Sequence, residues 1–162
     1  MTLTYTDGKS TQIYKYSIVK SELKHIEKIV ELAERGAYEV EIYTFNKIDV
    51  YNLTKEIIRK HVCISLLYGD EVVGYVGGVI FPNPYDVTFK RLLTMSWYVT
   101  PKHRNIWSIK LLKNYVKEGV NKKVHSISMQ SRMSKDPIRM TALYERLGFE
   151  ATEVAYELDT GV

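Results

Sequence analysis

One stretch of the sequence combines residue types that can bind an anion. An apolar run ends at Val99, and Pro101 then introduces basic and small polar residues ahead of a helical pattern. A strand that leads directly into a helix leaves backbone N–H groups free at the helix N-terminus, where the macrodipole also favours negative charge. We therefore predict a phosphate-binding loop here. The alternative is that the stretch is an ordinary connection between a strand and a helix.

A second stretch places a tyrosine near the end of a helix. Asp136 and Pro137 are typical of the first two positions of a helix, and Gly148 is typical of the left-handed C′ position. With Gly148 at C′, Tyr144 and Phe149 occupy the two positions whose side chains pack together in a Schellman motif. The local sequence therefore predicts a packing role for Tyr144.

The elements that position these stretches follow from the hydrophobic pattern. Alternating apolar residues predict strands, a period of 3.6 residues predicts helices, and glycine or proline marks the turns. In chain order the pattern predicts a strand at 13–19, helices at 22–35 and 53–61, strands at 62–68, 72–81 and 89–99, a helix at 107–118, a strand at 124–130, a helix at 136–147 and a last strand at 152–158.

Several boundaries of these elements rest on single residues. Ser21 is the expected N-cap of the first helix and Gly36 its C′ residue. Gly69 and Asp70 predict the turn of a β-hairpin, and the Pro-Asn-Pro sequence at 82–84 is expected to end the second strand of that hairpin.

The composition is that of a soluble globular protein with one domain. The 162 residues are 45% hydrophobic and 26% charged, and one domain typically has roughly 100 to 200 residues. No apolar run reaches the ~18 residues that span a membrane, and residues 1–10 lack the pattern of a signal peptide. We therefore expect a cytoplasmic protein without a membrane partner. Cys63 is the only cysteine, which excludes an internal disulfide, and its apolar neighbours predict a buried strand position.

The positive charge lies in the second half of the chain. Residues 1–81 contain 10 Lys/Arg and 11 Asp/Glu, whereas residues 82–162 contain 13 and 8. Within the second half, the stretch 100–123 has seven basic residues and the single acid Glu118, a local charge of +6 (seven minus one). Such a stretch can face a phosphate-bearing ligand, a nucleic acid or solvent. No zinc-finger, helix-turn-helix or RNA-recognition pattern accompanies it, which weighs against nucleic acid.

Two motifs within this order of elements resemble those of the GCN5-related N-acetyltransferase (GNAT) superfamily. Leu143-Tyr144-Glu145-Arg146-Leu147-Gly148-Phe149 is similar to the family's Leu-Tyr-Glu-x-Leu-Gly-Phe ending of the last helix. The stretch from Val99 to Arg104 is similar to its Val-x-Pro-x-x-Arg start of the acetyl-CoA loop. The resemblance implies an α/β (α+β) fold in a single domain, 1–162. Its mixed, mostly antiparallel sheet would have roughly six to seven strands, flanked by about four helices.

The resemblance also implies where acetyl-CoA binds and which group acts as an acid. The co-substrate is expected between the strands 89–99 and 124–130, with its pantetheine arm along Trp97 and Val99. Its pyrophosphate is expected on the amides of Arg104, Asn105, Ile106, Trp107, Ser108 and Ile109. Tyr144 matches the tyrosine that commonly protonates the departing CoA thiolate, and a phenol with a pKa of ~10 still carries its proton at neutral pH. No metal is expected.

The sequence departs from the family pattern at two points. The loop is usually Arg/Gln-x-x-Gly-x-Gly/Ala, whereas Trp107 and Ile109 stand at the small positions here. Glycine lets a ligand approach backbone amides because no side chain intervenes. In addition, the stretch 92–99 has no carboxylate or histidine that would accept the proton of an amine. The nearest options in the sequence are His103, His125 and Glu71.

These features predict an acyl-CoA-dependent N-acyltransferase. It would move an acetyl group from acetyl-CoA to a primary amine by direct attack, with Tyr144 as general acid and an acceptor that the sequence does not identify. The alternative is a GNAT-fold protein that has lost catalysis and serves as an interaction or assembly module. The missing loop glycines and the 13 tyrosines are the reasons for the alternative. A homodimer is compatible with both predictions.

Overall fold

A computed structural model describes residues 15–42, 44–130 and 137–152 of the chain. These residues belong to two units, one within residues 1–130 and the other within residues 131–162, and each unit is described by itself. Among the described residues, the first unit contains a five-stranded sheet and three α-helices, and the second contains the helix α4 (Pro137–Arg146). The predicted last strand, 152–158, lies outside the described residues except for its first position.

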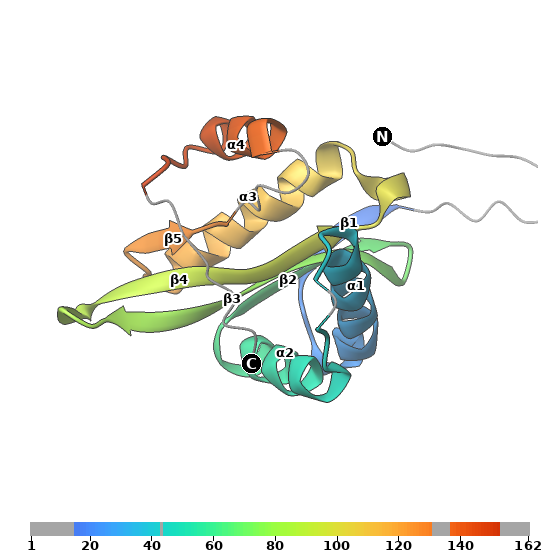
Figure 1. Cartoon of the computed structure of the whole chain (residues 1–162), viewed down its shortest axis with the longest axis horizontal. Helices are drawn as coiled ribbons and strands as arrows, with labels where there is room; N and C mark the ends of the chain where they lie inside the picture. The colour runs from blue at the N-terminus through green and yellow to red at the C-terminus, as the bar shows by residue number, and fades with distance from the viewer. Residues whose placement is uncertain (1–14, 43, 131–136, 153–162) are drawn as a thin grey trace, which may run out of the picture. The chain divides into compact units, whose positions relative to one another are not determined.

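The first unit is built on a five-stranded sheet whose strands follow their chain order (Figure 1). The strands are β1 (Tyr16–Lys20), β2 (Val62–Tyr68), β3 (Glu71–Asn83), β4 (Asp86–Val99) and β5 (Ser126–Ser128). β1 to β4 are antiparallel neighbours, whereas β5 runs parallel to β4. The predicted mixed, mostly antiparallel sheet is confirmed, with five strands in the described part of the chain rather than six to seven.

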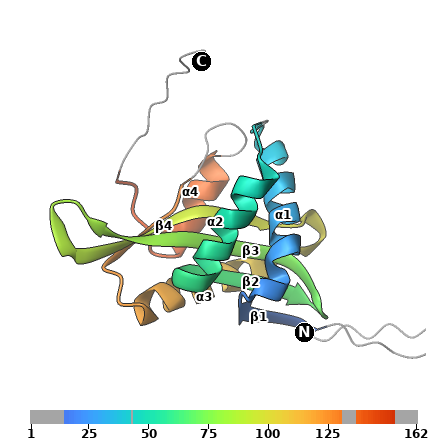
Figure 2. The same ribbon diagram turned by 90° about the horizontal axis from the view of Figure 1, so that it is seen from below.

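Three helices cover the sheet. α1 (Ile26–Glu39) and α2 (Lys47–Lys60) lie on one face, and α3 (Ile106–Asn121) lies on the other, as Figure 1 and Figure 2 both show. On the first face, side chains of α1 and α2 bury Cys63 and Tyr75 of the sheet in a common core. Cys63 is buried in strand β2, which confirms its predicted position. The burial raises the pKa of the Cys63 thiol to about 11. None of the helices in the described part of the chain is long and apolar enough to cross a membrane.

The boundaries predicted for the first helix are wrong at both ends. The Ser21 hydroxyl bonds the hydroxyl of Ser65 on β2 at 2.7 Å, and a short 3₁₀ turn (Leu23–His25) precedes α1. Gly36 is an interior residue of α1, which continues to Glu39. A Cβ atom at Gly36 would lie 3.0 Å from the ring of Tyr98 on β4. The glycine therefore serves the close approach of helix and sheet, a tertiary requirement that looks the same as a C-terminal glycine in the sequence.

Two further boundaries differ from their predictions. The second helix begins at Lys47 rather than near residue 53, because the Asn46 side chain caps it by accepting from the N–H groups of Ile48 and Asp49. The break predicted at 82–84 is also displaced. Pro82 lies within β3 opposite Lys90, next to a bulge, and the hairpin turns between Asn83 and Asp86.

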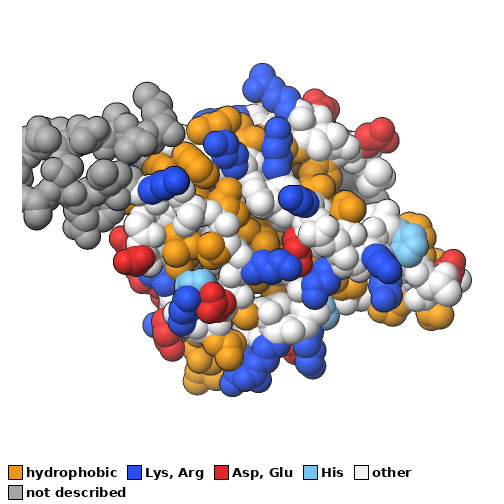
Figure 3. Space-filling view, turned by 180° about the vertical axis from the view of Figure 1, so that it is seen from behind, with side chains coloured by type: hydrophobic (Ala, Val, Ile, Leu, Met, Phe, Trp, Pro, Cys, Tyr) orange, Lys and Arg blue, Asp and Glu red, His pale blue; other side chains and the backbone are white. Residues whose placement is uncertain are grey.

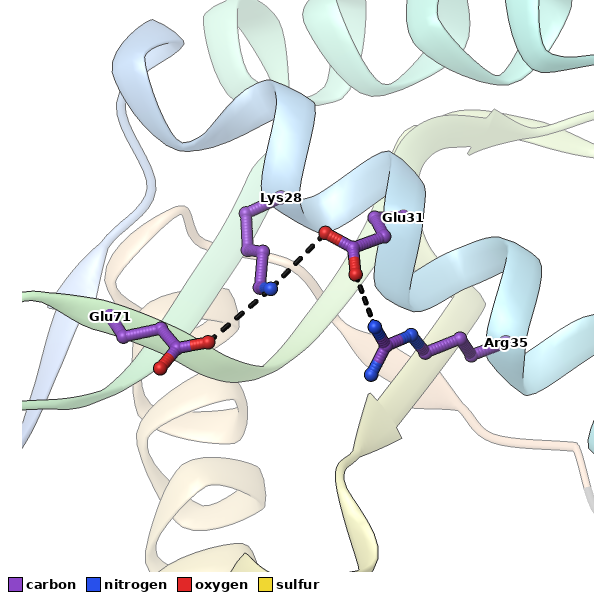
Figure 4. A network of polar contacts seen from close by, with 4 residues as sticks. All are labelled: Lys28, Glu31, Arg35 and Glu71. Atoms are coloured by element: carbon purple, nitrogen blue, oxygen red, sulfur yellow. Dashed lines mark hydrogen bonds and ion pairs between the residues drawn. The ribbon is translucent and has the colours of Figure 1, made fainter.

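An ion-pair network ties α1 to the start of β3 (Figure 4). Lys28 on α1 pairs with Glu31 at 3.1 Å and with Glu71 at 3.3 Å, and Arg35 pairs with Glu31. The side-chain hydrogen bond to Glu31 is the main reason that the pKa of Lys28 is raised. Because these groups are largely exposed, the network orients α1 more than it stabilises the fold.

Candidate functional site

β4 has an edge that is paired over only part of its length. β5 pairs with Arg91, Leu92 and Leu93 of β4. From Thr94 to Val99, β4 continues to pair with β3 on one side, but no strand among the described residues pairs with its other side. β5 is thus shorter than the strand predicted at 124–130, and the strand pairing of β4 on this side ends at Leu93. We call residues 94–99 the open edge, a stretch of strand edge of the kind with which the amides of a ligand can pair.

A bulge interrupts β4 at the start of this open edge. Gly77 lies opposite Ser96 and Gly78 opposite Thr94, so Met95 is an extra residue in β4. The backbone is tight here, because a Cβ atom on Gly78 would lie 2.0 Å from the Tyr115 hydroxyl of α3. That hydroxyl also accepts a hydrogen bond from the Thr94 hydroxyl at 3.0 Å. The bulge is thus held in place from α3.

Beyond the open edge, the chain turns directly into α3. A 3₁₀ turn (Pro101–His103) follows β4, and Asn105 is the N-cap of α3. The side-chain Oδ1 of Asn105 accepts from the N–H of Trp107 at 2.9 Å, and the backbone carbonyl of Asn105 accepts from the N–H of Ser108 at 3.0 Å. The predicted strand-loop-helix is therefore present. Four of the six amides predicted to meet a phosphate are bonded within the chain, namely those of Arg104, Asn105, Trp107 and Ser108.

Arg104, predicted to meet the pyrophosphate, is held by three groups. Its Nε donates to the carbonyl of Val99 at 2.8 Å, a terminal nitrogen pairs with the Glu39 carboxylate at 2.6 Å, and the guanidinium lies 5.2 Å from the centre of the Tyr98 ring. The hydrogen bond to Glu39 is the main cause that raises the pKa of Arg104. Arg104 thus connects the end of β4 to the end of α1.

Trp107 and Ile109, the bulky residues at the usual glycine positions, are both half-buried. The indole of Trp107 stacks on the ring of Tyr16 in β1, with centroids 5.3 Å apart and planes 21° apart. On α3 itself, the Lys110 ammonium lies 4.0 Å from the centre of the indole. The side chain of Trp107 is therefore packed between β1 and a lysine.

The predicted site residues of the first unit fall on one continuous path. Val99 is buried opposite Gly74, and Trp97 pairs with Val76, so both lie on the open part of β4. The path continues through Arg104 and the N-cap Asn105 into the first turn of α3, which contains Ile106, Trp107, Ser108 and Ile109. Their roles in binding stay predictions.

In the second unit, Tyr144 has the packing role that the sequence predicts. Gly148 has a φ of 87°, the N–H of Phe149 donates to the Tyr144 carbonyl at 3.0 Å, and the N–H of Gly148 donates to the Glu145 carbonyl at 2.9 Å. This is the hydrogen-bond pattern of a Schellman motif. The rings of Tyr144 and Phe149 are 6.0 Å apart between centroids. The role of Tyr144 as a general acid stays a prediction.

Each group considered as the missing base makes a structural contact. His103 bonds the Tyr16 hydroxyl, and its burial is the main cause that lowers the pKa of the imidazole. His125 stacks on Phe89 and accepts from the N–H of Lys90, and Glu71 pairs with Lys28. No cluster of three or more metal-binding side chains occurs among the residues that the structure describes.

Two residues of this region are missed by the sequence analysis. Tyr16 contacts the loop from β1, and Glu39 contacts Arg104 from the end of α1. Both are far from the loop along the chain, and neither belongs to a local motif. The packing of β1 against the loop and the start of α3, and of α1 near Arg104, brings them there. No signal in the local sequence indicates these contacts.

No protein-family model matches the sequence, and no curated protein matches it. Solved structures match its fold. A predicted acetyltransferase from Clostridium acetobutylicum, solved with acetyl-CoA, is 17% identical to this chain with a TM-score of 0.73, covering 90% of this chain and 96% of that one. A possible acetyltransferase from Clostridium difficile 630 is 18% identical with a TM-score of 0.70, covering 90% and 97%.

The similarity extends to a ribosomal-protein-alanine N-acetyltransferase from Brucella melitensis biovar Abortus 2308. It is 15% identical to this chain with a TM-score of 0.70, and the match covers 91% of this chain and 100% of that one. At these identities the likeness concerns the fold. The chain therefore has the fold of the GNAT acetyltransferases.

Proposed function

We propose that the protein is an acyl-CoA-dependent N-acyltransferase that moves an acetyl group from acetyl-CoA to a primary amine. The observation that carries the proposal is the open edge of β4, which leads through the 3₁₀ turn to the N-terminus of α3. The amides of a pantetheine arm can pair with a strand edge, and a pyrophosphate is favoured at a helix N-terminus. One ligand with both groups, joined in this order, fits the path from Trp97 to Ile109.

The charge around the path supports the same ligand. Lys102 and Lys110 are exposed next to the loop. On the face shown in Figure 3, lysine and arginine side chains are scattered among acidic and apolar ones and do not form a separate patch. Stacking on Trp107 holds the Lys110 ammonium at the first turn of α3. These cations supply charge that attracts phosphates, in a loop where glycine is missing.

Catalysis would rest on positioning and on a single acid. The neutral amine attacks the thioester carbonyl, the C–N bond forms, the C–S bond breaks, and the CoA thiolate takes a proton from the Tyr144 hydroxyl. The amine loses its proton to water, and Tyr144 regains one from solvent. Backbone N–H groups on the open edge of β4 are suited to polarise the thioester carbonyl. The proximity of the bound thioester and amine supplies most of the rate enhancement.

Acetyl-CoA binding tests the proposal directly. A ligand at 100 times its Kd stabilises a protein by about 2.7 kcal/mol, which corresponds to a rise of roughly 5 to 10 °C in the melting temperature for a chain of this size. We expect such a rise with acetyl-CoA and a smaller one with ADP. An unchanged melting temperature at millimolar acetyl-CoA would contradict the proposal.

A second candidate is a GNAT-fold protein that has lost catalysis and acts as an interaction or assembly module. The intramolecular contacts of Asn105 and Arg104 favour it, since both residues already bond within the chain. Such a module would form a stable complex or oligomer and ignore CoA. Light scattering combined with a CoA titration separates the two candidates. An oligomer alone does not, because an acetyltransferase can also dimerise.

A further inference from the structure

One side chain from β1 contacts three residues around the start of α3. The Tyr16 hydroxyl bonds Nδ1 of His103 at 2.7 Å and accepts from Nδ2 of Asn105 at 3.3 Å. The Tyr16 ring stacks on Trp107 and also meets the His103 ring edge-on, with centroids 5.6 Å apart. We call residues 103–107 the α3 start segment. His103 is 87 residues away from Tyr16 along the chain.

These contacts act on the group that sets the helix N-terminus. Asn105 accepts the N–H of Trp107 with Oδ1 and donates to Tyr16 with Nδ2. The Tyr16 hydroxyl thereby fixes the plane of the capping amide. Its oxygen accepts from Asn105, and its proton is available for His103, so both hydrogen-bonding capacities of a phenol are used.

The ring of Tyr16 is itself supported from the sheet. Tyr68 on β2 lies 4.8 Å from Tyr16 and 5.0 Å from His103, measured between ring centroids. Offset and tilted aromatic contacts of this kind add about 0.5–1.5 kcal/mol each beyond their burial. The α3 start segment is therefore held against strands β1 and β2 by side chains.

This arrangement addresses the absence of glycine in the loop. A glycine-rich loop lets backbone amides meet a phosphate because no side chain intervenes. In this chain Trp107 and Ile109 occupy the small positions, so a phosphate can approach the loop only where the Trp107 indole lies to one side. Stacking on Tyr16 places the indole against β1.

We propose that Tyr16 is a positioning residue for acetyl-CoA binding, which fixes the α3 start segment through His103, Asn105 and Trp107. The proposal rests on the proposed function, since it assigns how this chain builds the phosphate end of that site. It concerns the binding of acetyl-CoA and not the transfer step. Losing the Tyr16 hydroxyl therefore weakens affinity more than it slows turnover at saturation.

The variant Tyr16→Phe keeps the ring stacking and removes both hydrogen bonds of the hydroxyl. We expect the Kd for acetyl-CoA to rise about tenfold, since the two hydrogen bonds that hold the α3 start segment are lost, while kcat at saturating acetyl-CoA changes less than about twofold. Tyr85→Phe is the matched control, because Tyr85 is 97% exposed at the hairpin tip. The variant Tyr16→Leu, which also loses the stack, should bind more weakly still.

Amide hydrogen exchange tests the positioning without any ligand. In Tyr16→Phe the N–H groups of Trp107 and Ser108, which bond the Asn105 cap, should exchange faster than in the wild type, whereas those in the middle of α3 should not. Unchanged exchange at Trp107 and Ser108, or an unchanged Kd, would overturn the role of Tyr16 and leave the proposed function intact. A wild-type protein that does not bind acetyl-CoA would overturn both.

Discussion

At the scale of single residues, Tyr144 combines a packing role with a proposed chemical role, and one substitution separates them. Tyr144→Phe keeps the ring next to Phe149 and leaves the backbone bonds of the Schellman motif unchanged. We expect kcat to fall about 100-fold, the lower end of what a general acid contributes, while the Kd for acetyl-CoA changes less than about threefold. Steady-state kinetics and a binding titration measure the two values. An unchanged kcat would contradict the acid role.

Gly78 gives a second prediction for a single residue. A Cβ atom there would lie 2.0 Å from the Tyr115 hydroxyl and 2.6 Å from the Leu93 carbonyl, so Gly78→Ala forces the bulge in β4 and α3 apart. The expected loss in the free energy of unfolding is about 2 kcal/mol or more. The neighbouring Gly77→Ala is the control, because its Cβ would make only ordinary contacts at 3.5 Å or more. Equal losses in urea unfolding for both variants would show that the clash is not the cause.

At the scale of elements, the N-terminus of α3 depends on Asn105. Removing this cap by Asn105→Ala is expected to lower the free energy of unfolding by about 1 kcal/mol, whereas Asn105→Ser should retain most of it. Urea denaturation measures the difference. Alanine and serine variants of equal stability would mean that the bond from the Trp107 N–H to Asn105 does not stabilise the helix.

The element order could be predicted from the sequence because it depends on local pattern. The hairpin turn at Gly69, where φ is 62°, and the Schellman ending at Gly148 follow from the conformations that glycine allows. Gly36 shows the limit of such reasoning. Glycine also permits close packing between elements, and only the position of Tyr98 on β4 distinguishes the two uses.

The candidate site also has one part that the local sequence predicts and one part that only the packed fold reveals. The path from Trp97 to Ile109 is continuous in the chain, so a motif is enough to find it. Tyr16 and Glu39 reach that path from β1 and α1, and their contacts exist only once the sheet and helices have packed. The side chains that hold the loop were therefore beyond prediction from one sequence.

At the scale of the whole molecule, the histidines make stability depend on pH. Burial is the largest cause that lowers the pKa of His25, His61 and His103 from 6.5. His25 and His61 also accept a backbone N–H at Nδ1, from Glu22 and Ile80 respectively, which a protonated ring does not do. Below pH 6.5 the unfolded chain binds more protons than the folded one, so stability is complete above pH 6.5 and decreases as the pH falls towards the folded pKa values.

We therefore expect the melting temperature to decrease between pH 7.5 and pH 5. Carboxylates with lowered pKa values, such as Glu31 and Glu118, lose their charge only at more acidic pH. The double variant His25→Asn with His61→Asn, whose amides can still accept the backbone N–H groups, should show a weaker decrease. A wild-type melting temperature that is flat or rises over this range would contradict the prediction.

The central claim is that acetyl-CoA binds along the open edge of β4 and at the start of α3. Backbone amide chemical shifts, followed while acetyl-CoA is added, test this claim residue by residue. We predict the largest changes at 97–99 and 104–109, with little change at the exposed hairpin tip around Tyr85. No change at millimolar acetyl-CoA, or changes confined to other parts of the sheet and helices, would contradict the account.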